Sequence, residues 1–185
     1  MSDKYMTMTE LEAGLAAAGP SPADGGRLEM IVCRPEDERR QVLDQAQLDP
    51  NEGLVGDNWR ARGSRHTDDG RANPDMQITM MNSRIIGLLA GDRKGWPPAG
   101  DQLYVDLDIS PENMPVGQRF TIGQALLEIT AVAHTGCSKF TERFGSDAIR
   151  FVNSPEGRAG RRRGVYARVI KPGVVKTGDL IVKTP

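Results

Sequence analysis

Short runs in which apolar and polar residues alternate, each ended by glycine or proline, most constrain how this chain can fold. The clearest run covers residues 103–109, where every second residue is leucine, valine or isoleucine and two of the others are aspartates. A period of two is typical of a strand with one buried face. The 185 residues include 21 glycines and 12 prolines but only 5% aromatic residues, which favours short strands joined by tight turns over a helical bundle.

The same pattern predicts further strands over residues 27–34, 77–81, 127–133, 165–169 and 180–182. Short helices are predicted over residues 9–19, 35–48, 84–90, 138–144 and 146–152. The helix that begins at Pro35 would carry an apolar stripe of Val42, Leu43 and Ala46. Residues 53–70, which include His66, and residues 156–164 are predicted to be glycine-rich, arginine-rich loops.

Roughly seven or eight strands without regular strand–helix alternation predict a mostly β protein. We expect a closed or nearly closed β-barrel with peripheral helices. The expected division is an N-terminal helix and linker over residues 1–26, followed by one barrel domain over residues 27–185.

Charge and cysteine content exclude several classes of protein. Lysine and arginine number 24 against 25 acids, so the overall charge predicts neither a nucleic-acid nor a membrane partner. Two cysteines without a CxxC motif argue against a disulfide framework and a four-cysteine zinc site, and a reducing cytoplasm is the simplest compartment. We find no basic and apolar leader, and no apolar run approaches the ~20 residues that span a bilayer.

One cysteine occupies a position suited to chemistry. Cys137 follows a predicted strand and a polar break, and it comes just before a predicted helix. Unpaired N–H groups and the helix dipole at such a point lower the pKa of a thiol. The alternative is a buried cysteine that acts as a small hydrophobe, and this is our interpretation of Cys33 in the apolar run LEMIVC.

The thiol and the two arginine-rich loops suggest binding of an anion. Arginine recognises phosphate and carboxylate through paired hydrogen bonds, and a thiolate suits thiophilic transition metals. Together they would suit a phosphate-bearing cofactor that carries a metal, but equally a cysteine nucleophile or persulfide carrier acting on an anionic substrate. The phosphate-loop, dinucleotide, HExxH and GxSxG motifs are absent, and His66 and His134 are too few for the usual zinc schemes.

Five runs resemble the signatures of a known family, in its order. They are GLVGDNW, QITMMNSRI, AGDQLYVDLDISPENMPVGQRFTIGQALLEIT, HTGCSKF and GVYARVIKPGVVKTGDLI. Together they resemble the MOSC domain, named for the C-terminal domain of molybdenum-cofactor sulfurases, over about residues 27–182. The resemblance implies a barrel like that of pyruvate kinase. It also implies that Cys137 binds molybdenum or carries sulfur, with Asp57, Asn113 and Arg168 around a cofactor pocket.

Characterised members of this family use molybdenum cofactor to reduce N-hydroxylated bases and amines. By this resemblance, the first hypothesis is an oxidoreductase in which Cys137 Sγ coordinates molybdenum. Arginines of the two loops would hold the phosphate of the pterin, namely Arg60, Arg62, Arg162 and Arg163. Electrons would come from a separate protein, because the chain has no flavin, haem or iron–sulfur motif.

Two alternatives remain open at this stage. The first is a non-redox sulfur-carrier or cofactor-binding module that uses a persulfide on Cys137. The second is a scaffold in which this cysteine is only structural. No pyridoxal phosphate is predicted, because these residues include no aminotransferase-like domain.

Overall fold

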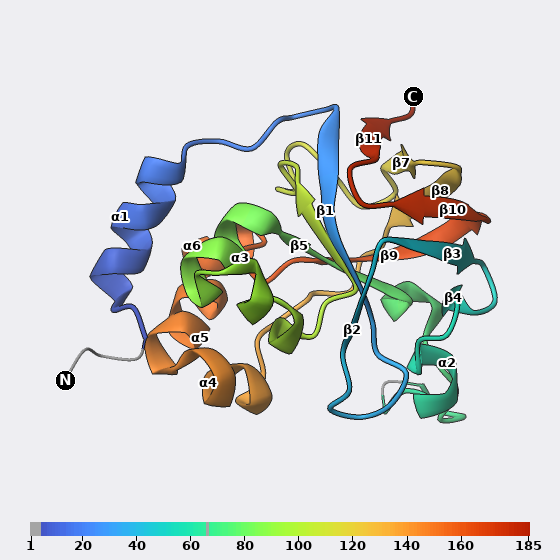
Figure 1. The fold of residues 1–185 in the computed structure, drawn as a ribbon, viewed down its shortest axis with the longest axis horizontal. Coiled ribbons are helices and arrows are strands. Elements are labelled where there is room, and N and C mark those ends of the chain that lie inside the picture. Colours follow the sequence, from blue (N-terminus) through green and yellow to red (C-terminus); the bar gives the residue numbers. More distant parts are fainter. Residues whose placement is uncertain (1–4, 66) are drawn as a thin grey trace.

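The structure is a computed structural model, and it describes residues 5–65 and 67–185, so His66 lies outside the described residues. Seven strands close into a barrel (Figure 1): β1 (Gly26–Cys33), β11 (Leu180–Lys183), β7 (Arg119–Ile122), β8 (Ala125–Ile129), β9 (Val165–Lys171), β5 (Ile78–Asn82) and β6 (Leu103–Asp106), which returns to β1. Neighbouring strands are antiparallel except β5 and β6, which are parallel. The predicted closed barrel with peripheral helices is confirmed.

Two smaller features extend the barrel. Strand β2 (Gln41–Leu43) pairs with the end of β1, and a second sheet consists of β10 (Gly173–Lys176), β3 (Gln45–Asp49) and β4 (Gly53–Leu54). Apolar side chains fill the barrel, and Leu28, Met80, Val105, Phe120 and Leu127 are completely buried. Strand β8 shows how the sequence produces this core, since alternate residues are buried, as its alternating pattern predicts.

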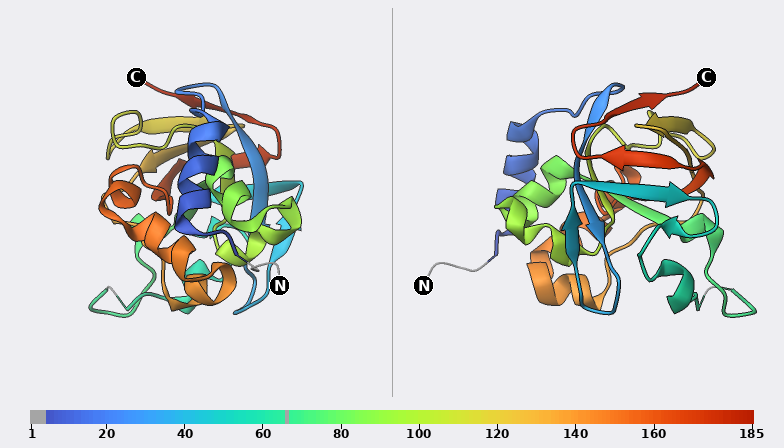
Figure 2. Two further views of the ribbon diagram at one scale, coloured as in Figure 1. Left: turned by 90° about the vertical axis from the view of Figure 1, so that its left-hand side faces the viewer. Right: turned by 45° about the vertical axis from the view of Figure 1, so that its right-hand side comes forward.

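Five helices lie on one side of the barrel (Figures 1 and 2): α1 (Met8–Ala18), α3 (Ser83–Ala90), α4 (Ser138–Phe144), α5 (Ser146–Asn153) and α6 (Pro155–Ala159). They bury a second apolar cluster that includes Leu11, Ile86, Phe140 and Phe151. Helix α2 (Trp59–Arg62) lies away from them, and single 3₁₀ turns occupy Pro74–Met76, Arg93–Gly95 and Pro97–Ala99. Every helix within the described residues is too short or too polar to cross a membrane.

The prediction of a helix that begins at Pro35 is wrong, because this segment forms β2 and β3. In β3, Ala46 and Leu48 are buried and their neighbours face outward, so the true period is two. Val42, expected inside, is 56% exposed. Backbone pairing of β2 with β1 and of β3 with β10 outweighs the weak helical spacing of the apolar residues.

Both predicted arginine-rich loops contain regular structure. Residues 53–70 include β4 and α2. Residues 156–164 begin within α6, where Ser154 accepts a hydrogen bond from Gly157 N and Pro155 occupies the first turn. A side-chain cap followed by proline strongly favours the start of a helix. The loop was predicted instead because the residues that follow are rich in glycine and arginine.

Candidate functional site

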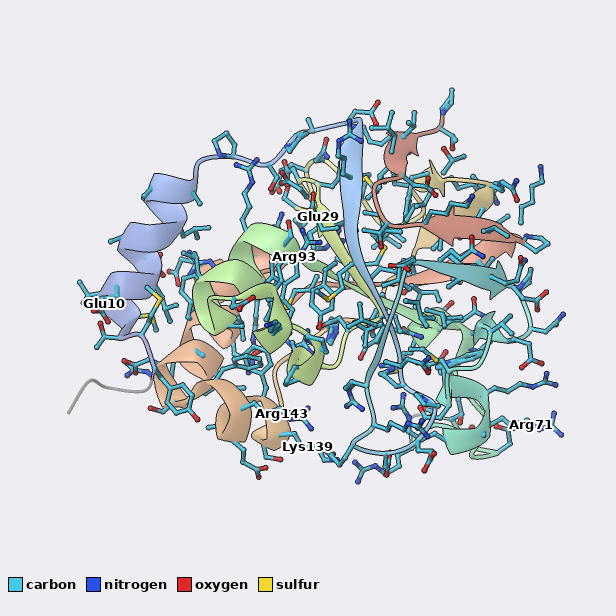
Figure 3. All side chains as sticks on the ribbon, in the orientation of Figure 1. Glu10, Glu29, Arg71, Arg93, Lys139 and Arg143 are labelled. Carbon is cyan, nitrogen blue, oxygen red and sulfur yellow. The ribbon has the colours of Figure 1, made fainter. Side chains whose placement is uncertain are left out.

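A cavity of about 300 Å³ opens where the connection from β1 to β2, helix α2 and the segment before α4 meet. Six cationic residues border it: Arg34, Arg40, Arg62, Lys139, Arg143 and Arg163. Three acids, all from one segment, border it as well: Glu36, Asp37 and Glu38. Figure 3 shows Lys139 and Arg143 close together on α4, whereas Arg71 lies at the opposite edge of the molecule. Lys139 and Arg143 pair with Glu38, and two of the other cations pair with buried acids behind the wall. The positive charge that remains for an anionic ligand comes from Arg40 and Arg62.

Cys137 borders this cavity as an exposed residue at the N-terminal end of α4. The segment that presents it is held by Asn153 of α5, which accepts from Gly136 N at 2.9 Å and donates to Gly136 O at 3.2 Å. A Cβ atom on Gly136 would approach Ile149 Cδ1 to 2.5 Å, so a larger residue there would require the Ile149 side chain to move. The other cysteine, Cys33, is buried in the barrel core, and burial raises the pKa of its thiol. The two thiols therefore differ in access as the sequence predicts.

A buried ion pair supports one wall of the cavity. Arg34 donates through Nε to Asp57 Oδ2 and through Nη2 to Asp57 Oδ1, each at 2.9 Å. Both side chains are almost inaccessible, at 7% and 0%. Asp57 also accepts from the backbone nitrogens of Arg34 and Trp59, which fixes the start of α2. Asp57 thus lies behind the cavity wall and holds Arg34 in place.

Asp101, His134 and Arg163 form a second buried cluster. Asp101 Oδ1 lies 2.9 Å from His134 Nε2, and Arg163 Nη1 donates to Asp101 Oδ2 at 2.6 Å. Burial opposes ionisation of Asp101, but Arg163 and His134 outweigh it and keep the pKa of this carboxyl below its ordinary value. Burial, aided by the charge of Arg163, lowers the pKa of His134 despite the carboxylate beside it, so the ring is neutral near pH 7. The ring stacks on Tyr166 with centroids 4.5 Å apart.

Unpartnered polar atoms concentrate around the cavity. Within the described residues, six buried side-chain atoms lack a hydrogen-bond partner: Arg40 Nε, Asn58 Oδ1, Trp59 Nε1, Trp96 Nε1, His134 Nδ1 and Arg163 Nε. All but Trp96 belong to residues that border the cavity. Buried polar atoms in folded proteins are nearly always paired, so this concentration marks a place for a polar ligand.

Comparison with known proteins agrees with this geometry. The family model described as MOSC domain matches residues 96–182, which include β6–β9 and Cys137. This part of the chain is therefore similar to the MOSC domain. No curated protein matches the chain.

Solved structures resemble this chain over most of its length. The YuaD protein from Bacillus subtilis matches with a TM-score of 0.59 and 18% identity, over 86% of this chain and 96% of that one. YiiM from Escherichia coli matches with a TM-score of 0.56 and 18% identity, over 86% of this chain and 70% of that one. YiiM from Geobacillus stearothermophilus matches with a TM-score of 0.54 and 14% identity, over 86% of this chain and 75% of that one. These TM-scores show a shared fold, which extends beyond the residues that the family model covers.

The residues predicted to form the site fall into two groups in the structure. Cys137, Arg62 and Arg163 border the cavity, and Asp57 lies directly behind it. The others lie elsewhere, as follows: Arg60 pairs with Glu52, Arg162 pairs with Glu12 and lies over the Phe151 ring, Arg168 pairs with Glu128 and Asp75, and Asn113 binds the carbonyls of Ala23 and Asp108. Asn113 thus holds a bend.

Sequence reasoning missed the side chains that complete the cavity. Arg34 precedes the segment that was predicted to be a helix, Arg40 lies within that segment, and Asp101 precedes β6. A usable signal existed for Lys139 and Arg143, which lie four residues apart and so share one face of α4. The position of Asp101 between glycine and an apolar strand was also a signal, because an acid there is either buried and paired or functional.

Proposed function

We propose that the cavity binds molybdenum cofactor, with Cys137 Sγ as the one protein ligand to the metal. The observation that carries the proposal is the exposed thiol beside a cavity bordered by six cations. The described residues contain no group of three or more histidine, cysteine, aspartate and glutamate side chains placed to hold a metal. A metal that brings its own organic ligand needs no such group, since a single soft thiolate completes its coordination.

The residues fit the cofactor at its anionic end as well. Arg40 and Arg62 form no ion pair within residues 5–65 and 67–185, so their charges remain available for a phosphate. The volume of about 300 Å³ matches the lower end of the range for small-ligand sites. Burial, with the nearby charge of Arg34, lowers the pKa of Arg62, and an anion would relieve this repulsion.

The reaction that we propose is reduction of an N-hydroxylated substrate. The cofactor, when bound, supplies two electrons that cleave the N–O bond, and with two protons the products are the amine and water. The cations of the chain hold the cofactor beside Cys137 and favour a negatively charged ligand. A separate electron-donor protein in the cytoplasm belongs to the proposal, because the chain has no redox motif of its own.

Metal analysis tests the proposal directly. The wild type, Cys137→Ala and the matched control Cys33→Ala are produced in a host that makes molybdenum cofactor, and molybdenum and pterin are measured per chain. We expect nearly stoichiometric amounts of both in the wild type and the control, and loss of both from Cys137→Ala. Reduction of hydroxylaminopurine with a chemical electron donor should follow the metal content. A wild type that lacks molybdenum although its Cys137 is intact and unoxidised would overturn the proposal.

The exposure of Cys137 also favours a second function, in which this thiol carries a persulfide or the domain only holds and delivers the cofactor. An accessible sulfur can exchange with a partner thiol. Intact-mass spectrometry distinguishes the two functions. A sulfur adduct that a reductant removes and that Cys137→Ser lacks, together with no reductase activity, would support the second function.

A further inference from the structure

The hydrogen-bond geometry around Asp101 fixes the position of the proton on His134. A carboxylate only accepts hydrogen bonds, and Arg163 already donates to Oδ2 of Asp101. The facing nitrogen, His134 Nε2, must therefore carry the hydrogen that completes the 2.9 Å contact with Oδ1. In a neutral ring the other nitrogen, Nδ1, then carries a lone pair and can only accept.

This lone pair has no donor within the described residues. Nδ1 is buried and unpartnered, and the ring borders the same cavity as Cys137. The stack on Tyr166, with ring planes 20° apart, holds the ring in this orientation. The alternative tautomer would lose its contact with Asp101, so the acceptor at Nδ1 is built into the fold.

Acceptors are scarce among the unpartnered atoms that surround the cavity. Arg40, Trp59 and Arg163 offer donors there, and only Asn58 Oδ1 and His134 Nδ1 can accept. A simple anion such as phosphate would use the donors and leave both acceptors unsatisfied. A heteroaromatic ring with N–H groups on its edge, such as a pterin, would use both kinds of group.

We propose that His134 Nδ1 accepts a hydrogen bond from an N–H group of the pterin bound beside Cys137, and that Asp101 is the positioning residue that fixes the required tautomer. The assignment rests on the proposed function, because it takes the pterin of the cofactor as the ligand. The cations would then recognise the charge of this ligand, and His134 would recognise its ring.

Asp101→Asn tests the tautomer with almost no change of volume. Arg163 can only donate, so the new amide must turn its oxygen toward Arg163 and its NH₂ group toward His134. Nε2 then has to accept, the hydrogen moves to Nδ1, and the acceptor becomes a donor that repels the ligand N–H group. The same logic explains how an aspartate orients the histidine in serine proteases.

Two measurements decide the assignment. Long-range ¹H–¹⁵N NMR of histidine-labelled protein shows which nitrogen carries the hydrogen; the only other histidine, His66, is assigned with His66→Gln. We expect Nε2–H in the wild type and Nδ1–H in Asp101→Asn. Pterin content per chain, after production in a cofactor-producing host, should fall about tenfold or more in Asp101→Asn and in His134→Gln. The amide of glutamine can replace Nε2 of the histidine but not Nδ1.

The matched controls separate this role from a merely structural one. His134→Asn places an acceptor near the Nδ1 position and should retain more pterin than His134→Gln. Asp106→Asn changes a carboxylate that also pairs with an arginine, Arg84 at 2.8 Å, but away from the cavity, and it should retain the wild-type content. An Nδ1–H tautomer in the wild type, or full pterin content in both Asp101→Asn and His134→Gln, overturns the assignment alone. A wild type without pterin overturns the proposed function as well.

Discussion

The arginines of the outer surface and those of the cavity differ in how they are paired. On the surface, Arg84, Arg119, Arg162 and Arg168 each lie within 3.4 Å of a carboxylate. In the cavity, Arg40 and Arg62 form no ion pair within the described part of the chain, and Arg163 has an unpartnered Nε. Arg34, Arg143 and Arg163 of the cavity also have acidic partners. The cavity therefore departs from the usual matching of charges at Arg40 and Arg62.

This difference indicates which region serves binding. Burial first, and then the charges of Arg143 and Arg34, lower the pKa of Arg40, so the ligand-free cavity holds cations that repel one another. Natural proteins accept such a cost mainly at functional sites. An anionic ligand would relieve the repulsion between the cations of the cavity, whereas the paired arginines of the surface need no ligand.

The largest effect should come from the buried pair behind the cavity. Asp57→Ala leaves Arg34 buried without its partner, and we expect the free energy of unfolding to fall by about 3–5 kcal/mol. Removal of one partner from a buried pair is costly because the remaining charge is desolvated and uncompensated. Denaturant titration measures the change through the midpoint and slope of the transition.

An exposed pair provides the control for this prediction. Glu12→Ala removes the partner of Arg162. Because the Glu12 side chain is 48% exposed, the free energy of unfolding should fall by about 1 kcal/mol or less. Equal losses in Asp57→Ala and Glu12→Ala would contradict the distinction between buried and exposed pairs. The double variant Arg34→Met with Asp57→Leu should recover part of the stability, since it removes both charges together. The backbone nitrogens of Arg34 and Trp59 would still lack the acceptor that Asp57 provides.

The barrel could be predicted from the sequence because its signal is local. Strand β8 and strand β6 each show a period of two within a few residues, and turns bounded by glycine or proline limit them. The segment from Pro35 to Leu48 could not be predicted in this way. Its short strands, β2 and β3, owe their conformation to partners that lie far away in sequence, and its apolar spacing fits a helix equally well.

The site was predictable only where one segment contains it. Cys137 follows from a strand end and a helix start that are adjacent in sequence. Two of the cations around it lie on the helix that follows it, and the other four come from three distant segments. Neighbouring residues also diverge, since Arg162 reaches Glu12 whereas Arg163 reaches Asp101. Arginine-rich composition predicts the presence of cations but not the direction in which each side chain leaves a turn.

A smaller effect should distinguish the two groups of arginines by binding. We expect Arg62→Ala to weaken the affinity for inorganic phosphate by about tenfold or more, because a hydrogen bond to a charged group contributes about 1.5–3 kcal/mol. Its stability should change by no more than about 0.5 kcal/mol, since no ion pair is broken. Isothermal titration calorimetry at low salt measures the affinity, with Arg168→Ala as the control from the surface. Loss of affinity in Arg168→Ala but not in Arg62→Ala would reverse the assignment of these arginines.

The smallest effect concerns the pH dependence of stability at His134. Asp101, Arg163, Arg34 and Tyr166 surround this ring, and burial together with Arg163 keeps its pKa below the ordinary value of 6.5. The unfolded chain therefore binds the proton more readily, and the contribution of His134 to stability is complete above pH 6.5 and declines as the pH falls toward the lowered value. Asp101, whose pKa is lowered from 3.8, loses its contribution only in more acidic solution. The wild type should thus lose more stability than His134→Gln between pH 7.5 and pH 5. Denaturant titrations at both pH values would measure the two losses. Equal losses in the two proteins would show that the ring is not held neutral.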